Sequence, residues 1–249
     1  MTYCVGLQLQ EGLVLISDSR TNAGIDNIST YRKLHLFEQP GERVIAIATS
    51  GNLSISQSVI SLLQEGIANP ETGDIETLLN VSTMFKAAQL VGRAVRMIFN
   101  TDGASLEQHH AGFDVALLVG GQIKGRRLRL FMVYAAGNFI ESTEDTPFLQ
   151  IGEHKYGKPI LDRAVSYRTD LYDGLKIGLI SMDSTMRSNL AVGLPIDIMV
   201  LRRDALRPEL VHRIEQEDGY FADLRHRWSR ALREAHLAIP APPYGGRGS

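Results

Sequence analysis

Alternating apolar and polar residues near the N-terminus predict a pair of β-strands. Apolar residues alternate with more polar ones through Val5–Leu9, a period of two that is typical of a half-buried strand. Glu11-Gly12 predicts a turn, and the apolar run Leu13–Ile16 predicts a buried strand returning from it. Because antiparallel strands of similar length bring their outer ends together, this hairpin is expected to place Asp18 near Thr2.

The same criteria predict the order of the remaining elements. We expect strands at Tyr31–Phe37, Val44–Thr49, Phe113–Val119, Leu128–Ala136, Phe148–Ile151 and Ile196–Leu201. Apolar residues at helical spacing predict helices at Leu53–Glu65, Thr77–Phe99, Leu161–Tyr167 and Leu171–Met182. Ser19–Ser29 and Asn69–Asp74 are polar and are expected to be loops. Separate blocks of strands and helices predict an α+β fold, with two stacked sheets and helices on their outer faces.

The composition changes after Leu201, where arginines and Pro208 mark a boundary. We therefore expect one domain over 2–201 and a C-terminal extension over 202–249. Within the extension, Asp218–Leu237 predicts a helix whose apolar stripe includes Trp228, and Pro240–Ser249 predicts a disordered tail. The stripe fits either intrachain packing or a contact between subunits, and we favour a role in assembly.

Composition narrows the class of protein. The chain has 249 residues, of which 44% are hydrophobic, enough for one globular domain with a sizeable core. A formal net charge of −2 gives no electrostatic reason to expect a nucleic-acid partner. The single cysteine, Cys4, excludes an internal disulfide and suits a reducing compartment. The longest apolar run, Leu130–Ala136, is too short to span a membrane, and no signal-peptide pattern is present. The expected location is the cytoplasm.

Thr2 is the candidate nucleophile. An initiator Met is normally removed when a small residue such as Thr follows it. Removal of Met1 would give Thr2 a free α-amine beside its own hydroxyl, so that a base and a nucleophile share one residue. An α-amine titrates near pH 8, roughly two units below a lysine, and can therefore accept and return a proton near neutral pH.

Three further residues supply the other requirements of acyl transfer. Lys33 is expected to lie near Thr2 as a cation and to lower the pKa of its hydroxyl. Asp18 would pair with Lys33 and hold it in place. The N–H of Gly51, at a strand-to-helix turn, is the expected oxyanion donor. Each of these residues alone is more typical of a structural role, and it is their order along the chain that indicates a hydrolase.

Several blocks of sequence resemble the β-subunits of proteasomes. The terminal Thr2, the segment Asp18–Gly24, Lys33 and Ser50-Gly51 match the proteasome pattern. The chain is most similar to the bacterial ancestral β-subunit group, often called Anbu. That similarity lies in the segments Thr2–Val5, Ser17–Gly24, Gln150–Glu153, Lys155–Arg163 and Asp183–Asn189. The resemblance covers Thr2 to about Leu201.

The resemblance implies a four-layer αββα sandwich of the N-terminal nucleophile hydrolase type and amide-bond hydrolysis through an acyl-enzyme. It implies that Thr2 is the nucleophile, that Asp18 and Lys33 activate it, and that Gly51 is the oxyanion donor. It also implies assembly of identical subunits into rings or open helical stacks. The chain has no phosphate-binding glycine loop, so ATP use by the chain itself is not expected, and any unfoldase that feeds it would be a separate protein.

The resemblance assigns further roles by position. Arg20 and Asn22 occupy the strand that pairs with the substrate backbone. Asp183 and Ser188 correspond to groups that orient the terminal amine, with Ser184 as a competing candidate because the spacing differs from that of proteasomes. Where proteasomes carry Gly-Ser-Gly, this chain has Gly152–His154 and so lacks one hydroxyl partner.

These observations leave three functions open. The first is an N-terminal threonine peptidase or amidohydrolase, which would need no cofactor and no metal; His109-His110 has no third ligand at a recognisable spacing. The second is a self-assembling scaffold with little turnover, which Glu153 favours. The third is an amide ligase or transferase that passes the acyl group from Thr2 to an amine.

Overall fold

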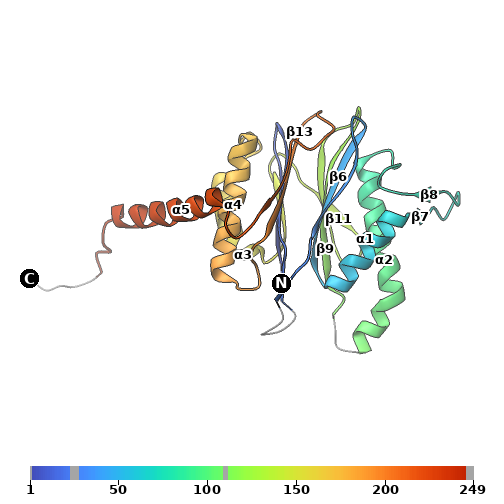
Figure 1. Cartoon of the computed structure of the whole chain (residues 1–249), viewed down its shortest axis with the longest axis horizontal. Helices are drawn as coiled ribbons and strands as arrows, with labels where there is room; N and C mark the ends of the chain where they lie inside the picture. Colours follow the sequence, from blue (N-terminus) through green and yellow to red (C-terminus); the bar gives the residue numbers. More distant parts are fainter. Residues whose placement is uncertain (1, 23–27, 109–111, 245–249) are drawn as a thin grey trace, which may run out of the picture. The chain divides into compact units, whose positions relative to one another are not determined.

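Two five-stranded antiparallel sheets lie face to face, with helices on both outer sides (Figure 1). The structure is a computed structural model of the chain, and it describes residues 2–22, 28–108 and 112–244. The chain divides into one compact unit over Met1–Gln216 and a second over Glu217–Ser249. The sheets and all the candidate site residues belong to the first unit.

The first sheet carries Thr2 and Asp18 at one end. Its strand order is β12-β1-β2-β13-β14. In the predicted hairpin, Cys4 lies opposite Ser17, and on the next strand Ile196 lies opposite Asp18. The bounds are β1 (Tyr3–Gln8), β2 (Gly12–Asp18), β12 (Phe148–Gly152), β13 (Ile196–Arg202) and β14 (Leu210–Ile214).

The second sheet has the strand order β11-β10-β9-β6-β5. Gly51 is the last residue of its strand β6 and lies opposite Val115 on β9. Its strands are β5 (Leu34–Gln39), β6 (Arg43–Gly51), β9 (Val115–Ile123), β10 (Arg129–Val133) and β11 (Phe139–Glu141). Two small ribbons accompany it, one made of β3 (Arg20–Asn22) and β4 (Ile28–Thr30), the other of β7 (Ile67–Ala68) and β8 (Ile75–Glu76).

Helices α1 (Leu53–Glu65) and α2 (Met84–Gln108) cover the second sheet, and α3 (His154–Ala164) and α4 (Leu171–Ser188) cover the first (Figure 1). Asn52 begins α1 by accepting a hydrogen bond from Ser54 N–H, the usual role of Asn at a helix start. No described helix combines the length and the apolar composition that crossing a bilayer requires.

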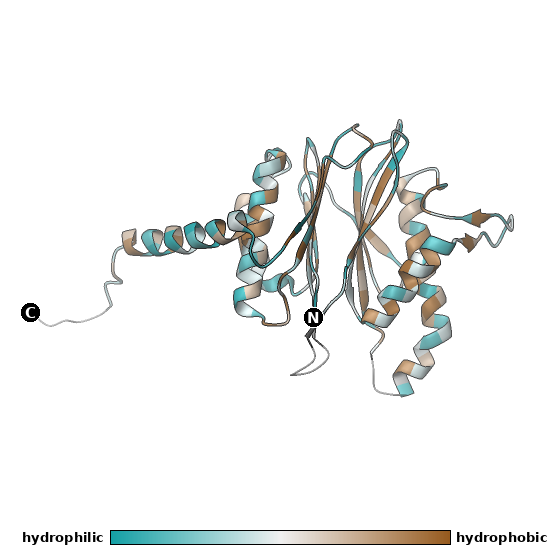
Figure 2. Cartoon of the chain, in the orientation of Figure 1, coloured by the Kyte–Doolittle hydropathy of each residue, from teal (hydrophilic) through white to brown (hydrophobic). Residues whose placement is uncertain are grey.

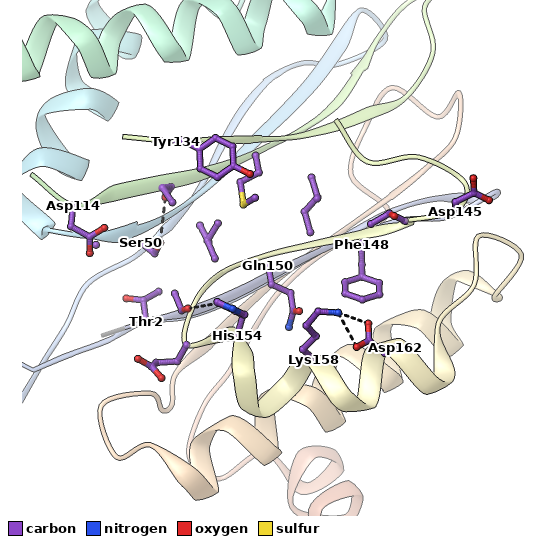
Figure 3. Close-up of a pocket in the computed structure, with 18 residues that line it drawn as sticks. Thr2, Ser50, Asp114, Tyr134, Asp145, Phe148, Gln150, His154, Lys158 and Asp162 are labelled. Atoms are coloured by element: carbon purple, nitrogen blue, oxygen red, sulfur yellow. Dashed lines mark hydrogen bonds and ion pairs between the residues drawn. The ribbon is translucent and has the colours of Figure 1, made fainter. Parts of the chain in front are cut away.

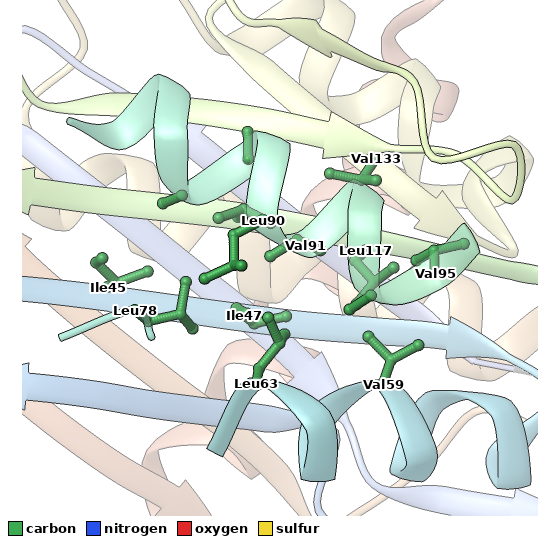
Figure 4. Close-up of a cluster of buried hydrophobic side chains, with 14 of the residues drawn as sticks. Ile45, Ile47, Val59, Leu63, Leu78, Leu90, Val91, Val95, Leu117 and Val133 are labelled. Atoms are coloured by element: carbon green, nitrogen blue, oxygen red, sulfur yellow. The ribbon is translucent and has the colours of Figure 1, made fainter. Parts of the chain in front are cut away.

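Apolar side chains fill the space between these layers. One cluster lies between α1, α2 and the second sheet, where Val59 and Val91 face Ile47 (Figure 4). A second cluster lies between the two sheets and includes Leu13 and Met199. Hydrophobic residues accordingly follow the strands and the inner sides of the helices (Figure 2). This burial provides most of the driving force that fixes the ends of the sheets and hence the site.

Two predicted helices have different bounds in the structure. The helix predicted at Leu161–Tyr167 is α3, which begins at His154 and ends at Ala164. Gly157 and Pro159 disfavour a helix by propensity and concealed its first half. The helix predicted at Thr77–Phe99 is α2, which begins at Met84 and continues to Gln108. Hydrogen bonds between Thr77 and Asn80 hold the preceding segment in a turn, although its buried Leu78 and Val81 mimic helical spacing.

The sequence also missed short strands. Part of the predicted loop Ser19–Ser29 pairs as β3 and β4, because main-chain hydrogen bonding needs no apolar side chains. Strand β14 lies beyond Leu201 and pairs with β13, so the predicted division after Leu201 falls inside the first compact unit. Strand β11 lies beyond the predicted strand Leu128–Ala136 and was not predicted. The remaining predicted strands and helices are present, with ends shifted by a few residues.

The second unit contains the predicted C-terminal helix, α5 (Gly219–Ala238). Asp218 begins it by accepting a hydrogen bond from Phe221 N–H at 2.7 Å. The helix carries mostly hydrophilic residues (Figure 2). Toward its end, Leu232 and Leu237 are 51% and 78% exposed.

Candidate active site

The main chain of Thr2 is held on both sides at the start of β1. Its carbonyl accepts a hydrogen bond from Glu153 N–H at 2.8 Å, and the next amide, Tyr3 N–H, donates to Asp18 Oδ1 at 3.1 Å. Gly152 packs directly against this carbonyl: it has a φ of +80°, and a Cβ built on it would lie 1.9 Å from Thr2 O. Thr2 itself is only 5% exposed. The backbone around Thr2 is therefore fixed in position by Gly152 and Glu153 on one side and by the Asp18 carboxylate on the other.

Asp18 and Lys33 form a buried ion pair beside Thr2. Lys33 Nζ lies 3.0 Å from Asp18 Oδ1 and also donates to Arg20 O at 2.5 Å. The other carboxylate oxygen of Asp18 accepts from Gly193 N–H at 3.4 Å. Asp18 is fully buried and Lys33 is 4% exposed. Burial raises the pKa of Asp18, while the Lys33 ammonium and the two backbone donors act to lower it. A buried ammonium is thus held next to the candidate nucleophile.

Gly51 lies at the end of β6, where the chain turns into α1. Its φ of +99° is in the region that favours glycine, and a Cβ there would lie 2.3 Å from Asp114 O. The following amide, Asn52 N–H, donates to Asp114 O at 2.7 Å. Gly51 lines two cavities together with Thr2. This position is suitable for an oxyanion donor.

The larger of these cavities is a cleft of about 780 Å³. Thr2 and Ser50 lie near one end and Asp145 lies at the other, with Tyr134 and Phe148 along its walls (Figure 3). Its other polar residues include Asp114, Gln150, Glu153, His154, Lys158 and Asp162. The smaller cavity, of about 30 Å³, is lined by Thr2, Thr21, Lys33, Thr49, Ser50, Gly51, Leu53 and Ser56. Thr2 lies between a large cleft and a small polar pocket.

The predicted substrate-binding residues lie on β3. The Arg20 guanidinium donates to Leu190 O at 3.0 Å and packs against Gly193, so it holds the segment after α4. Only the main chain of Asn22 is described, and it pairs with Ile28. Between them, Thr21 lines the small pocket, and its buried hydroxyl has no hydrogen-bond partner in the described part of the protein. Sequence analysis did not single out Thr21, because nothing distinguishes it from any other Thr in a polar loop.

The residues predicted to orient the terminal amine lie on α4. Asp183 is fully buried, and one of its oxygens lies 3.1 Å from Arg187 Nε one turn later. Ser184 is half-buried, whereas Ser188 is the last residue of α4 and is exposed. None of the three is among the described residues that line the cavities at Thr2. Glu153, which replaces the expected hydroxyl, points its carboxylate toward Lys155 at 3.7 Å.

A buried polar network behind Thr2 was also missed. Gln150 Nε2 donates to the Tyr3 hydroxyl, which is hydrogen-bonded in turn to Ser181 Oγ. Gly157 lets helix α3 approach closely there: a Cβ at this position would lie 2.4 Å from the Tyr3 hydroxyl. Burial raises the pKa of Tyr3 to about 12. The partners are separated by about 150 residues or more, so no local pattern could have revealed the network.

Cys4, the only cysteine, is fully buried in the cluster between the two sheets and is hydrogen-bonded to Ser17 Oγ at 3.1 Å. Burial raises its pKa from 9.0 to about 12, so the thiol stays protonated and unreactive at neutral pH. The stabilisation from this raised pKa is complete below pH 9.0 and is lost as the pH rises toward 12.

The expected consequence is that the unfolding free energy falls by about 2 kcal/mol more in the wild type than in Cys4→Ala between about pH 8 and about pH 10.5. Urea unfolding of both proteins at the two pH values measures this difference. Equal losses in the two proteins would contradict a buried, protonated thiol.

Comparisons with known proteins identify close structural relatives. No protein-family model matches the chain, and no protein of curated function matches it. Among solved structures, Anbu (ancestral beta-subunit) from Yersinia bercovieri is 49% identical, with a TM-score of 0.89, over 98% of this chain and 100% of that one. Anbu from Hyphomicrobium sp. strain MC1 is 46% identical, with a TM-score of 0.88, over 96% and 99%. The chain in the structure entitled "Helical Assembly of the Anbu Complex from Pseudomonas aeruginosa" is 46% identical, with a TM-score of 0.90, over 97% of this chain and 98% of that one.

Proposed function

This chain belongs to the Anbu (ancestral β-subunit) family, and on that premise we propose that it is an N-terminal threonine amidohydrolase that cleaves peptide or other amide bonds. Its fold is the proteasome-like fold of that family. The face-to-face sheets with helices outside support the finer description of a four-layer αββα sandwich. The observation that carries the proposal is the buried Asp18–Lys33 pair next to a clamped Thr2.

In the proposed reaction, Thr2 Oγ attacks the carbonyl carbon of the scissile amide while its proton passes to the α-amine of the same residue. The Gly51 N–H stabilises the oxyanion. The α-amine then gives the proton to the leaving nitrogen, the C–N bond breaks, and an ester on Thr2 remains. Water, deprotonated by the same α-amine, hydrolyses this ester and restores Thr2.

Each supporting residue has a stated role in this scheme. The Lys33 ammonium lowers the pKa of the Thr2 hydroxyl, and Asp18 keeps Lys33 oriented. We assign orientation of the α-amine to Asp183, with the half-buried Ser184 favoured over the exposed Ser188. The free α-amine itself requires removal of Met1, which precedes Thr2 in the sequence.

An extended substrate would lie between β3 and the end of β6. The main chain of Arg20–Asn22 and that of Gly51 would pair with its backbone, because Thr21 and Gly51 both line the small pocket beside Thr2. The Arg20 side chain is occupied by Leu190 O, so we assign only its backbone to substrate.

The chain is proposed to act as a homo-oligomer, either a ring or an open helical stack, because a relative at 46% identity forms a helical assembly. The exposed Leu232 and Leu237 of α5 support a role for the extension in contacts between subunits. We propose a cytoplasmic location and delivery of substrates by a separate protein. We propose a two-part organisation of the chain, with catalysis in the unit that holds the sheets and assembly contacts in the unit that holds α5.

A second candidate is a scaffold with little turnover. One observation favours it: Glu153 replaces the expected hydroxyl. A ligase or transferase would use the same acyl-Thr2 and differ only in its acceptor.

Acylation by an activated peptide ester separates these functions. The Met1-free protein is mixed with the ester, quenched, and examined by intact mass and peptide mapping. A hydrolase gives an acyl adduct on Thr2 that disappears in water alone. A transferase gives an adduct that persists until an amine such as glycinamide is added. Absence of an adduct would support the scaffold and contradict the proposed hydrolase.

A further inference from the structure

A second cleft lies at the opposite edge of the two sheets, between β5 and the strands β13 and β14. We call it the edge cleft, and its volume is about 410 Å³. It shares no lining residue with the two cavities at Thr2. Strands β5 and β14 are the last strands of their sheets, so the cleft opens between two sheet edges. Its volume is in the range of small-molecule sites, roughly 300–1,000 Å³.

One wall of the edge cleft holds a buried carboxylate that lacks a donor. Asp197 lies opposite Ser17 on β2 and Arg213 on β14, on the same side of β13 as Met199, which packs between the sheets. The residue is 6% exposed, and its Oδ2 atom has no hydrogen-bond partner in the described part of the chain. Burial raises the pKa of Asp197, as expected for a carboxylate that is short of donors.

Two arginines approach this carboxylate without completing a hydrogen bond. Arg32 Nε is 3.8 Å from Oδ2, and Arg213 Nη1 is 3.5 Å from Oδ1. A charged N–H···O hydrogen bond is normally about 2.7–2.9 Å, so both contacts are long. Arg213 is further engaged with Ser19 Oγ at 3.3 Å and Glu215 at 3.3 Å. The Arg32 side chain is 62% exposed, and the remote ion pair with Asp197 is its one contact with a described acceptor.

The rest of the lining combines apolar residues with His35, Gln64 and His212. Leu34 and Leu36 from β5 face Met199 and Val211 from the other sheet across the cleft. Val211 is 63% exposed, an unusual position for a large aliphatic residue that points between two sheets. Leu34 and Met199 are already buried, so an apolar group entering here would remove water mainly from Leu36 and Val211.

We propose that the edge cleft binds a small zwitterionic ligand with an apolar side chain, of the amino acid or short-peptide class. Its ammonium group donates to Asp197 Oδ2, its carboxylate pairs with Arg32, and its side chain packs against Leu36 and Val211. An anion without an amine would leave Oδ2 unsatisfied beside a like charge. A cation without a carboxylate would be repelled by the two arginines and attracted by only one aspartate. A ligand with both charges supplies a donor to Asp197 and an acceptor to Arg32 at the same time.

Calorimetric titration of the full-length Thr2→Ala protein tests this proposal, because that variant removes turnover at Thr2. The probe is the dipeptide leucyl-leucine at millimolar concentrations, compared with N-acetyl-leucine, which lacks the amine, and leucinamide, which lacks the carboxylate. The dipeptide is expected to bind, and each truncated compound at least about tenfold more weakly, since each loses one charged hydrogen bond. Absence of dipeptide binding, or equal binding of all three compounds, would overturn the proposal.

Variants locate the binding. Asp197→Asn and Arg32→Gln are each expected to weaken dipeptide binding by about tenfold or more. Arg127 is an exposed arginine in the turn between β9 and β10, and Arg127→Gln serves as the matched control. This variant is expected to bind the dipeptide as tightly as the unaltered protein. Arg32 is exposed, so Arg32→Gln is expected to fold normally even if Asp197→Asn does not.

Dipeptide binding that all three variants leave unchanged would place the ligand elsewhere. Loss of self-assembly in Arg32→Gln without any dipeptide binding would assign the cleft to a second copy of the chain instead. Neither result depends on whether Thr2 is catalytic.

Discussion

Replacing Asp18 by Asn is expected to lower the unfolding free energy by about 3–5 kcal/mol, because it leaves a buried lysine without its counter-charge. Asp18 is fully buried and receives hydrogen bonds from Tyr3 N–H, Lys33 Nζ and Gly193 N–H. An amide at this position cannot neutralise the Lys33 ammonium, and its NH₂ group would oppose one of the three donors. The same change would release Lys33 and thereby slow acylation of Thr2.

Urea unfolding at fixed protein concentration measures this effect. The matched control is Asp173→Asn, which breaks an exposed pair with Lys176, the Asp173 side chain being 58% exposed. Exposed pairs contribute at most about 1 kcal/mol, so the control should be nearly neutral. Similar stability of the two variants would show that Asp18 and Lys33 do not form the buried pair on which the proposed site depends.

Gly152→Ala is expected both to destabilise the protein and to displace Thr2. A residue with a side chain at a φ of +80° costs about 1–2 kcal/mol, and the new Cβ would lie 1.9 Å from Thr2 O, a contact that the backbone must move to relieve. The shift would break the hydrogen bond from Glu153 N–H to Thr2 O. Misplacement of a nucleophile by about 1 Å can reduce its rate about 100-fold.

Gly41→Ala separates the two effects. Gly41 has the same φ of +80°, but a Cβ there would meet nothing within 4 Å. We expect Gly41→Ala to show only the conformational cost and to retain normal acylation of Thr2, measured with the activated peptide ester. Equal acylation rates for Gly152→Ala and Gly41→Ala would mean that the contact between Gly152 and Thr2 does not set the position of the nucleophile.

The sequence predicted those parts of the fold whose signal is local. Alternation in Val5–Leu9 and the apolar run Leu13–Ile16 located the hairpin that brings Asp18 to the start of β1. Helix α3 was misplaced because Gly157 and Pro159 are poor helix formers, and tertiary packing against Tyr3 outweighs their propensity. Glycines likewise weakened the prediction of α4, although Gly174 allows that helix to approach Leu9 closely.

The site was predictable only in part, because only some of its contacts join residues that are close in sequence. Asp18 and Lys33 lie within 15 residues of one another, and chain order sufficed to pair them. Gly193 N–H reaches Asp18 from 175 residues away, and the Arg20 side chain reaches Leu190 O across 170. No periodicity encodes such contacts, because they depend on how the segment after α4 returns to the sheet. The edge cleft depends in turn on β14, a strand hidden by the polar composition after Leu201.

The central claim is that Thr2 carries a free α-amine beside a reactive hydroxyl. A peptide epoxyketone tests it directly, because that probe closes a ring only on an amine and a hydroxyl of the same residue. The measurement is the intact mass of Met1-free wild type and of Thr2→Ala after incubation with the probe. We predict one adduct per chain on the wild type and none on Thr2→Ala. An unmodified wild type, or an adduct that persists in Thr2→Ala, would contradict Thr2 as the nucleophile.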